Sequence, residues 1–450
     1  MRVALITAGA AGMICGSCLN DNTLVRALRD LGHDAQLIPT YTPITTDGPE
    51  ATTSRVFMGG IRIYLEEKYP WFCNMPRWMT SWLDAKPLLR MAGKFAGSSD
   101  YSSLGNLTLS LLSGENGPHR HDMASLCDYL ARESRPEIMH MSNALISGIL
   151  PMIAKRLSAP IIVELQGDDI FLDGLKPQHK LLAIKAIREN TKNVARFHTP
   201  CVDYADYMAG YLGIDRSRFH VVPLGIDLGA YQTPPKSHKG GAPVLGYFAR
   251  MCSEKGLDLL LDAWLLLRNK PDFGTLKLQV GGYLGKAHQS YWKGLQKKVH
   301  DAGHADGLVH RPCATTVEKS AFFADCDLFS VPARMREPKG IYLLEAWAHG
   351  LSVIGPQYGS FPELISHTGG GILFERENVV KLAEAIESLL KDPDLAGEMG
   401  QKAKRIVGER FTSENMARAT LASYSEVLAS YSEVLASSSE VLASSSEVLA

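Results

Sequence analysis

The sequence lacks the features that mark membrane-spanning, secreted and nucleic-acid-binding proteins. No apolar run approaches the ~20 residues that a bilayer-spanning helix needs, and the N-terminus lacks the regions of a signal peptide. The eight cysteines are scattered over 450 residues, which does not fit the disulfide framework of a small secreted protein. The formal net charge of −1 argues against a dedicated nucleic-acid partner. We therefore expect a globular protein of the cytoplasm.

Several short catalytic motifs are also missing. The sequence has no Walker loop, no Gly-x-Ser-x-Gly elbow and no His-Glu-x-x-His helix. Asp325-Cys-Asp327 resembles a metal-binding Asp-x-Asp motif, but it precedes an apolar run, so both carboxylates are expected to flank a strand. His119-Arg-His121 lacks a third ligand at a suitable spacing. We expect neither a bound metal nor another cofactor.

Cys15 and Cys18 are spaced like the cysteines of a thioredoxin-like redox motif, between a strand and a helix. The α/β pattern continues far beyond a thioredoxin unit, however, and close packing requires small residues at this position. A redox function is therefore the less favoured interpretation.

Alternating strand and helix patterns fill the first half of the chain. Residues 2–8 form a continuous apolar run, residues 24–31 carry a helical pattern that ends at Gly32, and residues 33–39 give the next strand. This order is that of a doubly wound α/β unit. Further strands are expected at 137–140, 160–166 and 219–223.

A second series follows residues 231–243, a Pro-, Gly- and Lys-rich stretch that predicts an interdomain linker. A helix is expected at 256–268, and strands are expected at 244–248, 276–280, 327–331, 352–354 and 371–374. The sequence thus predicts an α/β protein with two Rossmann-like doubly wound domains, residues 1–230 and 244–410, facing a cleft.

Residues 69–121 interrupt the first domain with interleaved aromatic and basic side chains: Trp71, Phe72, Arg77, Trp78, Trp82, Lys86, Arg90 and Lys94. The favoured interpretation is a helical insertion packed on its own domain. The alternative is that residues 69–96 recognise the acceptor or make a peripheral contact with a membrane surface.

The C-terminus is of low complexity. Residues 411–429 are expected to form a helix, and a heptad-repeat tail occupies 430–450. The unit Ser-Tyr-Ser-Glu-Val-Leu-Ala stands at 423–429 and again at 430–436, and two serine-richer units follow. The period allows coiled-coil self-association, but the serines and the absence of positive charge favour an extension of marginal helicity.

The segment 336–350 combines the chemistry of an anion site with two carboxylates. Glu337 and Glu345 stand on either side of Gly340, and an apolar helix is expected to begin at Ile341. The free N–H groups and positive dipole end of such a junction attract an anion. The carboxylates accept hydrogen bonds from hydroxyl groups. Phosphate and hydroxyls bound by one segment indicate a nucleotide sugar.

Basic residues are expected close to this segment. Arg250 and Lys255 bracket the loop after strand 244–248, and Gly281-Gly282 ends the next strand. The carboxyl ends of the strands are where open α/β sheets bind ligands. Positive charge at this edge stabilises a departing diphosphate.

These residues resemble a known family. Arg250, Lys255, Glu337-x7-Glu345 and Gly350, with Pro223-Leu-Gly-Ile-Asp227 before the linker, are similar to the retaining glycosyltransferases of the GT-B fold, group 1 (family four). The resemblance runs over roughly residues 1–415 and is strongest over 219–375.

The resemblance implies roles for individual residues on the donor side. Glu337 approaches the hydroxyls of the transferred sugar, and Glu345 binds the ribose. Arg250 and Lys255 hold the diphosphate. Backbone groups of the donor site are assigned to Gly282, Lys339, Gly340, Ile341 and Tyr342.

The first domain matches the family less closely. The glycine loop after the first strand reaches the donor phosphate in the family, and either Gly12 or Gly16 fills that role here. Many members carry His-x-His at the end of the fourth strand, whereas this chain has His140-Met-Ser142-Asn143. Either Ser142 or Asn143 would then bond the sugar. His140 is equally well explained as a buried histidine at a strand end.

On the acceptor side, Gln166-Gly-Asp168-Asp169 stands where the family often has His-Gly-x-Asp. Either aspartate is a candidate for binding the acceptor hydroxyl. The acceptor itself is a glycan, a lipid or a small molecule.

The resemblance implies a glycosyltransferase that moves a sugar from a nucleoside diphosphate sugar to a hydroxyl group, with retention of anomeric configuration. Domain closure, alignment and charge stabilisation would supply the catalysis. The alternative is a nucleotide-sugar-binding protein that has lost its catalytic activity, because the second histidine is replaced by Ser142.

Overall fold

The computed structural model describes most of the chain. The described residues are 1–9, 16–44, 51–53, 56–69, 71–72, 75, 79, 101–231, 233, 241–313 and 315–448.

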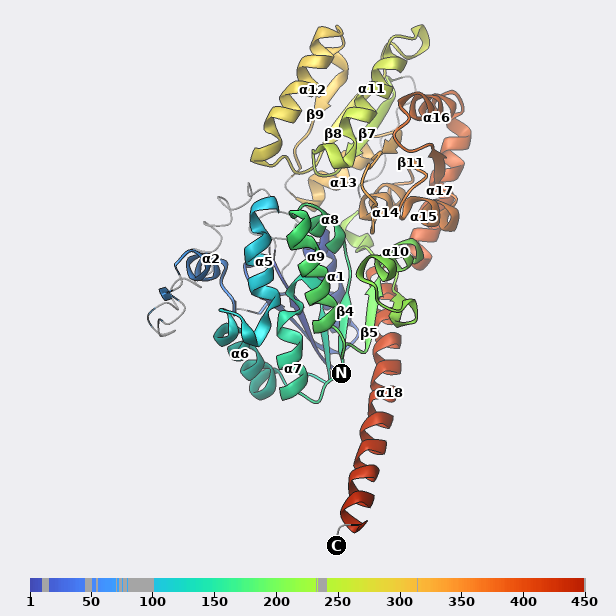
Figure 1. The fold of residues 1–450 in the computed structure, drawn as a ribbon. Coiled ribbons are helices and arrows are strands. Elements are labelled where there is room, and N and C mark those ends of the chain that lie inside the picture. Colours follow the sequence, from blue (N-terminus) through green and yellow to red (C-terminus); the bar gives the residue numbers. More distant parts are fainter. Residues whose placement is uncertain are drawn as a thin grey trace.

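Two parallel six-stranded sheets form the framework, one in each half of the chain (Figure 1). The first has the order β2-β1-β3-β4-β5-β6 and the second has the order β12-β11-β10-β7-β8-β9. The first-sheet strands are β1 (Arg2–Thr7), β2 (Asp34–Pro39), β3 (Ile138–Met141), β4 (Ile161–Glu164), β5 (Arg196–Thr199) and β6 (Phe219–Val221). The second-sheet strands are β7 (Val244–Phe248), β8 (Lys277–Gly281), β9 (Leu308–His310), β10 (Leu328–Ser330), β11 (Ser352–Pro356) and β12 (Gly371–Phe374). The predicted α/β class with two Rossmann-like domains is confirmed.

Two strands were not predicted, and their sequences show why. β5 places the polar residues Arg196 and His198 inside a sheet, so it lacks a continuous apolar run. β9 is an edge strand of three residues in which Val309 is 37% exposed. Apolar periodicity is a weak signal in both cases.

Helices cover the sheets in each domain. The first domain contains α1 (Gly16–Asp30), α2 (Gly60–Lys68), α5 (Gly105–Leu112), α6 (Arg120–Tyr129), α7 (Leu150–Arg156), α8 (Asp168–Asp173), α9 (Pro177–Asn190) and α10 (Val202–Leu212). The second contains α11 (Leu257–Arg268), α12 (Gln289–Asp301), α13 (Thr316–Ala324), α14 (Ile341–Ala348), α15 (Phe361–Thr368), α16 (Val379–Lys391) and α17 (Pro393–Arg410).

The region 69–121, expected to be a helical insertion, contains α5 and the start of α6. Trp71 is 64% exposed, and Phe72 is half-buried. The other aromatic and basic residues named for this region, from Arg77 to Lys94, lie outside the described residues, and so does most of the segment expected at a membrane surface.

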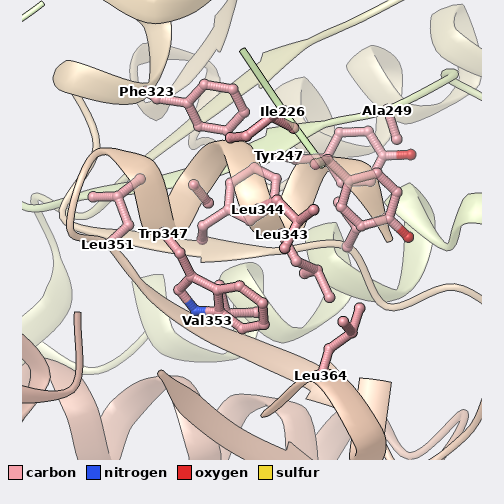
Figure 2. Close-up of a cluster of buried hydrophobic side chains, with 14 of the residues drawn as sticks. Ile226, Tyr247, Ala249, Phe323, Leu343, Leu344, Trp347, Leu351, Val353 and Leu364 are labelled. Carbon is pink, nitrogen blue, oxygen red and sulfur yellow. The ribbon is translucent and has the colours of Figure 1, made fainter. Parts of the chain in front are cut away.

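The helix α14, predicted from its apolar sequence, is anchored deep in the second domain. Figure 2 shows Leu343, Leu344 and Trp347 packed among side chains of the neighbouring elements, such as Phe323 and Val353. The Trp347 indole Nε1 also donates to the Gly370 carbonyl at 2.8 Å. Because this face is held rigidly, the N-terminus of α14 and the loop before it are fixed in position.

The last helix, α18 (Ser413–Val448), leaves the second domain and returns to the first (Figure 1). It packs against α1, and its far part projects beyond the first domain. The sequence predicts a helix to residue 429 and only marginal helicity beyond it. In the structure the helix continues without a break to Val448, because nothing in the repeats interrupts the helix and alanine and leucine favour it.

Candidate functional site

Glu337 and Lys255 form a buried ion pair at the carboxyl edge of the second sheet. Glu337 lies in the loop after β10 and Lys255 in the turn before α11, and the ammonium donates directly to Glu337 Oε2. Tyr342 Oη donates to the same oxygen at 2.8 Å. The amides of Lys339 and Gly340 each donate to Oε1 at 3.3 Å.

The environment of Glu337 fixes its charge. Burial alone would raise its pKa, but the Lys255 ammonium and the hydrogen bonds outweigh burial and lower the pKa to about 2. Glu337 is therefore ionised at neutral pH, and it is suited to accepting hydrogen bonds and not to donating a proton.

Glu345 lies one turn into α14 and is held by two residues that the sequence analysis did not single out. Lys319 Nζ of α13 donates to Glu345 Oε1 at 2.7 Å, and Tyr231 Oη donates to the same oxygen at 2.6 Å. Neither residue stands in a motif, so only the fold brings them to Glu345.

A cavity of about 410 Å³ opens beside Glu345, between the two domains. Its walls come from α1, from the residues after β6, and from the N-terminal parts of α13 and α14. The lining residues are Leu19, Asn22, Thr23, Arg26, Gly225, Ile226, Asp227, Gly229, Ala230, Tyr231, Thr316, Val317, Lys319, Ile341 and Glu345.

The loops carrying Arg250 and Gly282 lie together. Met251 N donates to Tyr283 O at 3.0 Å, which joins the loop after β7 to the loop after β8. Gly282 has φ +110°, and a Cβ there would lie 1.9 Å from the Ala249 carbonyl oxygen. Only glycine permits this close approach.

The first domain meets the donor-side loop at the start of α1. Lys339 Nζ donates to Ser17 Oγ at 2.7 Å, and a Cβ on Gly16 would lie 3.8 Å from Lys339 Nζ. The structure thus brings Gly16 close to the predicted donor residues. Gly12, the other predicted glycine, lies outside the described residues, as does Cys15.

The predicted acceptor-side residues gather where β3 and β4 end. Gln166 Nε2 donates to Ser142 O at 3.5 Å, and Asn143 accepts from Leu145 N at 3.1 Å. Asp168 accepts from the amides of Ala144, at 2.7 Å, and Gln166, at 3.1 Å.

The two aspartates of this group are buried. Burial raises the pKa of Asp168 to about 6, although its bonds from backbone amides oppose the rise. Asp169 accepts from Tyr204 Oη at 2.5 Å. Asp168 therefore orders the backbone that follows β3 and β4, and Asp169 joins the start of α8 to α10.

Sequence reasoning missed a buried polar cluster beneath these residues. Asp21 of α1 accepts from Thr7 Oγ1 at 2.7 Å and from Gln166 Nε2 at 2.9 Å. Burial, together with the nearby Glu164 carboxylate, raises the pKa of Asp21 well above its ordinary range. Asn20 Nδ2 donates to Glu164 at 3.2 Å. The polar run from Asn20 to Asn22 in a helix is the one sequence signal that pointed to this cluster.

His140 is fully buried and contacts protein groups through both ring nitrogens. Its Nδ1 lies 2.5 Å from Tyr424 Oη of α18. Its Nε2 lies 3.1 Å from Glu164 Oε2, without the angles of a good hydrogen bond. This is the arrangement of a buried histidine in a strand, the second of the two interpretations that the sequence left open.

Further contacts join the domains beside the site. Arg336 Nη1 donates to Asp203 Oδ1 at 2.5 Å, and its guanidinium lies between the rings of Tyr207 and Tyr358. Glu363 of α15 accepts from Val202 N, at the start of α10, at 2.8 Å.

The two motifs considered as metal sites, Asp325-Cys-Asp327 and His119-Arg-His121, contact protein groups. Asp325 pairs with Arg311 at 2.5 Å, and Asp327 accepts from Val244 N at 2.7 Å, as expected for carboxylates that flank a strand. His119 Nδ1 contacts Glu66 at 2.7 Å. Within the described ranges, no group of three or more His, Cys, Asp and Glu side chains is arranged to hold a metal ion.

Two family models match most of the chain between them. The model of glycosyl transferases group 1 matches residues 232–406, and the model of the glycosyl transferase 4-like domain matches residues 22–225. The matches correspond to the two domains of the structure.

The curated relatives that the chain matches are glycosyltransferases. The chain is 30% identical over 217 residues to a GDP-mannose-dependent alpha-(1-6)-phosphatidylinositol monomannoside mannosyltransferase of Mycobacterium tuberculosis. The aligned segment covers 45% of this chain and 54% of that protein. The chain is 29% identical over 229 residues to a D-inositol 3-phosphate glycosyltransferase of Paenarthrobacter aurescens, covering 49% of this chain and 55% of that protein. The chain thus matches about half the length of these relatives.

Solved structures share the whole fold. Sucrose-phosphate synthase from Thermosynechococcus elongatus superposes with a TM-score of 0.70 at 14% identity, covering 95% of this chain and 99% of the other. Anabaena HepE in complex with UDP gives a TM-score of 0.67 at 17% identity, covering 95% and 100%.

The two facing Rossmann-like domains define a GT-B architecture. The chain belongs to the group 1 glycosyltransferases. In the part of the chain that the structure describes, none of the helices combines the length and the hydropathy required to span a bilayer.

Proposed function

We propose that this protein is a glycosyltransferase that moves a sugar from a nucleoside diphosphate sugar to a hydroxyl acceptor, with retention of anomeric configuration. The observation that carries the proposal is the arrangement of Glu337 and Glu345 along one loop and helix. Glu337 is paired with Lys255, and Glu345 borders the interdomain cavity.

The site offers a suitable partner for each chemical group of the donor. The ribose hydroxyls would bond Glu345, with the base in the cavity beside it. The diphosphate would lie near the N-termini of α1 and α14, close to Arg250 and Lys255, where N–H groups and cations favour an anion. The transferred sugar would then reach Glu337, whose ionised carboxylate accepts bonds from its hydroxyls.

Catalysis would come from stabilising the departing diphosphate. Lys255 and the helix N-termini oppose the charge that develops when the glycosidic bond breaks. The acceptor would approach from Ser142, Asn143 and Gln166 on the first domain. Because cations and amides supply this stabilisation, we propose that the reaction needs no metal. Retention rests on the family resemblance.

Two of the relatives indicate which substrates to test first. Their names specify GDP-mannose as a donor and an inositol-containing acceptor. We propose that UDP-, GDP- and ADP-sugars be screened by thermal shift, since a ligand that binds the folded state raises its melting temperature. Stabilising donors are then tested for transfer to inositol, inositol phosphate and phosphatidylinositol in the presence of EDTA.

Variants connect the activity to the site. Glu345→Ala and Lys255→Ala are expected to weaken donor use sharply, whereas Glu398→Ala, at an exposed position on α17, is the matched control. Unchanged kcat and KM in both site variants would refute the donor site. Binding of a radiolabelled donor without any transfer or hydrolysis would favour a binding protein that has lost catalysis. Activity abolished by EDTA and restored by manganese would refute metal independence.

A further inference from the structure

One heptad of the C-terminal helix is inserted into the first domain. Ser423 and Tyr424 are both 0% exposed, although Ser425 and Glu426 beside them are exposed. Tyr424 Oη lies 2.5 Å from His140 Nδ1 of β3. Ser423 Oγ lies 2.8 Å from His198 Nε2 of β5.

Arg196 of β5 completes this contact. Its Nη1 donates to Ser423 Oγ at 3.0 Å and to Glu426 at 2.6 Å. The next heptad, 430–436, repeats the same seven residues, yet its Val434 is 61% exposed whereas Val427 is 5% exposed. Position along the helix, and not sequence, therefore decides which heptad contacts the first domain.

The contact continues through buried polar groups to the acceptor side. His140 Nε2 faces Glu164, and Asn20 Nδ2 lies within 3.2 Å of Glu164 Oε1 and 3.5 Å of Gln166 Oε1. Gln166 in turn reaches Ser142 O, and its own amide bonds Asp168. The path thus begins on α18 and ends at residues proposed to face the acceptor.

We propose that Tyr424 is a positioning residue for the acceptor half of the site and acts through His140, Glu164 and Asn20 on Gln166. The proposal rests on the proposed function, because it assigns a purpose to the acceptor-side residues. The helix α18, which starts in the second domain, would then complete the first domain's part of the site.

The direction of the hydrogen bonds explains how one hydroxyl acts at a distance. Burial, with the nearby carboxylates of Glu164 and Asp21, raises the pKa of Tyr424, so the phenol stays protonated. We assign its hydrogen bond as a donation to His140 Nδ1, because the histidine then presents an N–H group, and not a lone pair, to the Glu164 carboxylate 3.1 Å from Nε2. The imidazole proton is then on Nε2, facing Glu164. The Nε2 proton attracts the Glu164 carboxylate across 3.1 Å, and Glu164 Oε1 accepts from Asn20 Nδ2. Without the phenol, His140 is free to take the other tautomer, and the orientation of Asn20 and Gln166 is no longer specified.

The duplicated heptad provides a matched control. Tyr424→Phe removes the hydroxyl at the contact, and Tyr431→Phe removes the equivalent hydroxyl one heptad later. Ser423→Ala and Ser430→Ala form a second pair if Tyr424→Phe fails to fold. All four are made in the full chain.

Three measurements test the proposal. Nitrogen NMR of ¹⁵N-histidine-labelled protein, with the His140 signal assigned by its loss in His140→Gln, should show the Nε2-protonated tautomer in the parent chain and in Tyr431→Phe, but not in Tyr424→Phe. Hydrogen exchange at the backbone amides of Ala144 and Gln166 should be faster in Tyr424→Phe than in the parent chain or in Tyr431→Phe. In the transfer assay, Tyr424→Phe should lower kcat by about five- to tenfold, the effect of losing one buried hydrogen bond, and leave the KM for the nucleotide sugar unchanged.

Each result has a defined meaning. The same tautomer, or the same exchange rates, in Tyr424→Phe and Tyr431→Phe would overturn the proposal. Equal kcat values in the two variants would also overturn it, as would a raised KM for the nucleotide sugar. If no donor and acceptor support transfer, the proposed function fails, and the tautomer and exchange measurements still decide whether Tyr424 orders the acceptor-side residues.

Discussion

At the scale of single residues, the Lys255–Glu337 pair shows how a buried charge depends on its partner. Replacing Lys255 by Met leaves an ionised carboxylate buried with two amides and one phenol, and such a loss typically costs about 3–5 kcal/mol. We predict a much lower melting temperature for Lys255→Met than for Lys297→Met, whose ammonium pairs with Asp301 at the surface. Calorimetry measures both, and equal melting temperatures would contradict the prediction.

Glu337 should also make the stability of the folded protein depend on pH. Its pKa of about 2 in the folded protein lies below the ordinary value of 4.5. The group therefore stabilises the folded state above pH 4.5 and loses this contribution as the pH falls toward 2, a total of roughly 3 kcal/mol. We predict that the difference in melting temperature between the parent chain and Glu337→Gln shrinks from pH 6 to pH 3.5. Exposed Glu398→Gln should show no such trend.

Asp21 should have the opposite dependence. Its folded pKa is raised above the ordinary 3.8 by burial and by Glu164, so the folded state holds a proton that the unfolded chain releases. Stability from this proton is complete below pH 3.8 and is lost as the pH rises through the folded pKa. We predict that Asp21→Asn gains stability relative to the parent chain between pH 5 and pH 8. Asp34→Asn, at an exposed strand end, is the control, and parallel curves for Asp21→Asn and the parent chain would refute this prediction.

At the scale of elements, α18 combines a docked part with a projecting part. A chain ending at Ala429 keeps Tyr424 and Val427 buried, whereas a chain ending at Ala422 loses both, together with the contacts to His140, His198 and Arg196. We predict that the first truncation leaves melting temperature and activity unchanged. The second should lose several kcal/mol of stability, since burying one large side chain contributes about 2 kcal/mol. Thermal unfolding of the two truncated chains measures this difference. Similar losses of stability in both would contradict the division of α18 into a docked part and a projecting part.

At the scale of the whole molecule, Arg336 joins the two domains. It pairs with Asp203 and lies over Tyr207 of the first domain and Tyr358 of the second. Interdomain contacts of this kind set the balance between open and closed forms in two-domain proteins. We predict that Arg336→Ala increases the radius of gyration of the ligand-free protein in small-angle scattering. Arg405→Ala, which loses only a pair with Glu409 on the same helix, should leave it unchanged.

Much of the fold could be predicted because it is encoded locally. Ten of the twelve strands are predicted from the pattern of apolar residues in the sequence, and α14 has Glu345 as its single charged residue. β5 escaped prediction because Arg196 and His198 contact α18, a helix more than 200 residues away. Polar residues in a strand cannot be distinguished from a loop until their partners are known.

The sequence by itself determined the two-domain α/β class and the spacing of Glu337 and Glu345, because each depends on short-range periodicity or on residues close in the chain. The tertiary structure decided which partners these groups have. Lys319 and Tyr231 meet Glu345 across 26 and 114 residues, and Tyr424 meets His140 across 284. A hydrogen bond requires atoms about 3 Å apart. Only the packing of the sheets and the return of α18 bring residues so far apart in the chain to that distance.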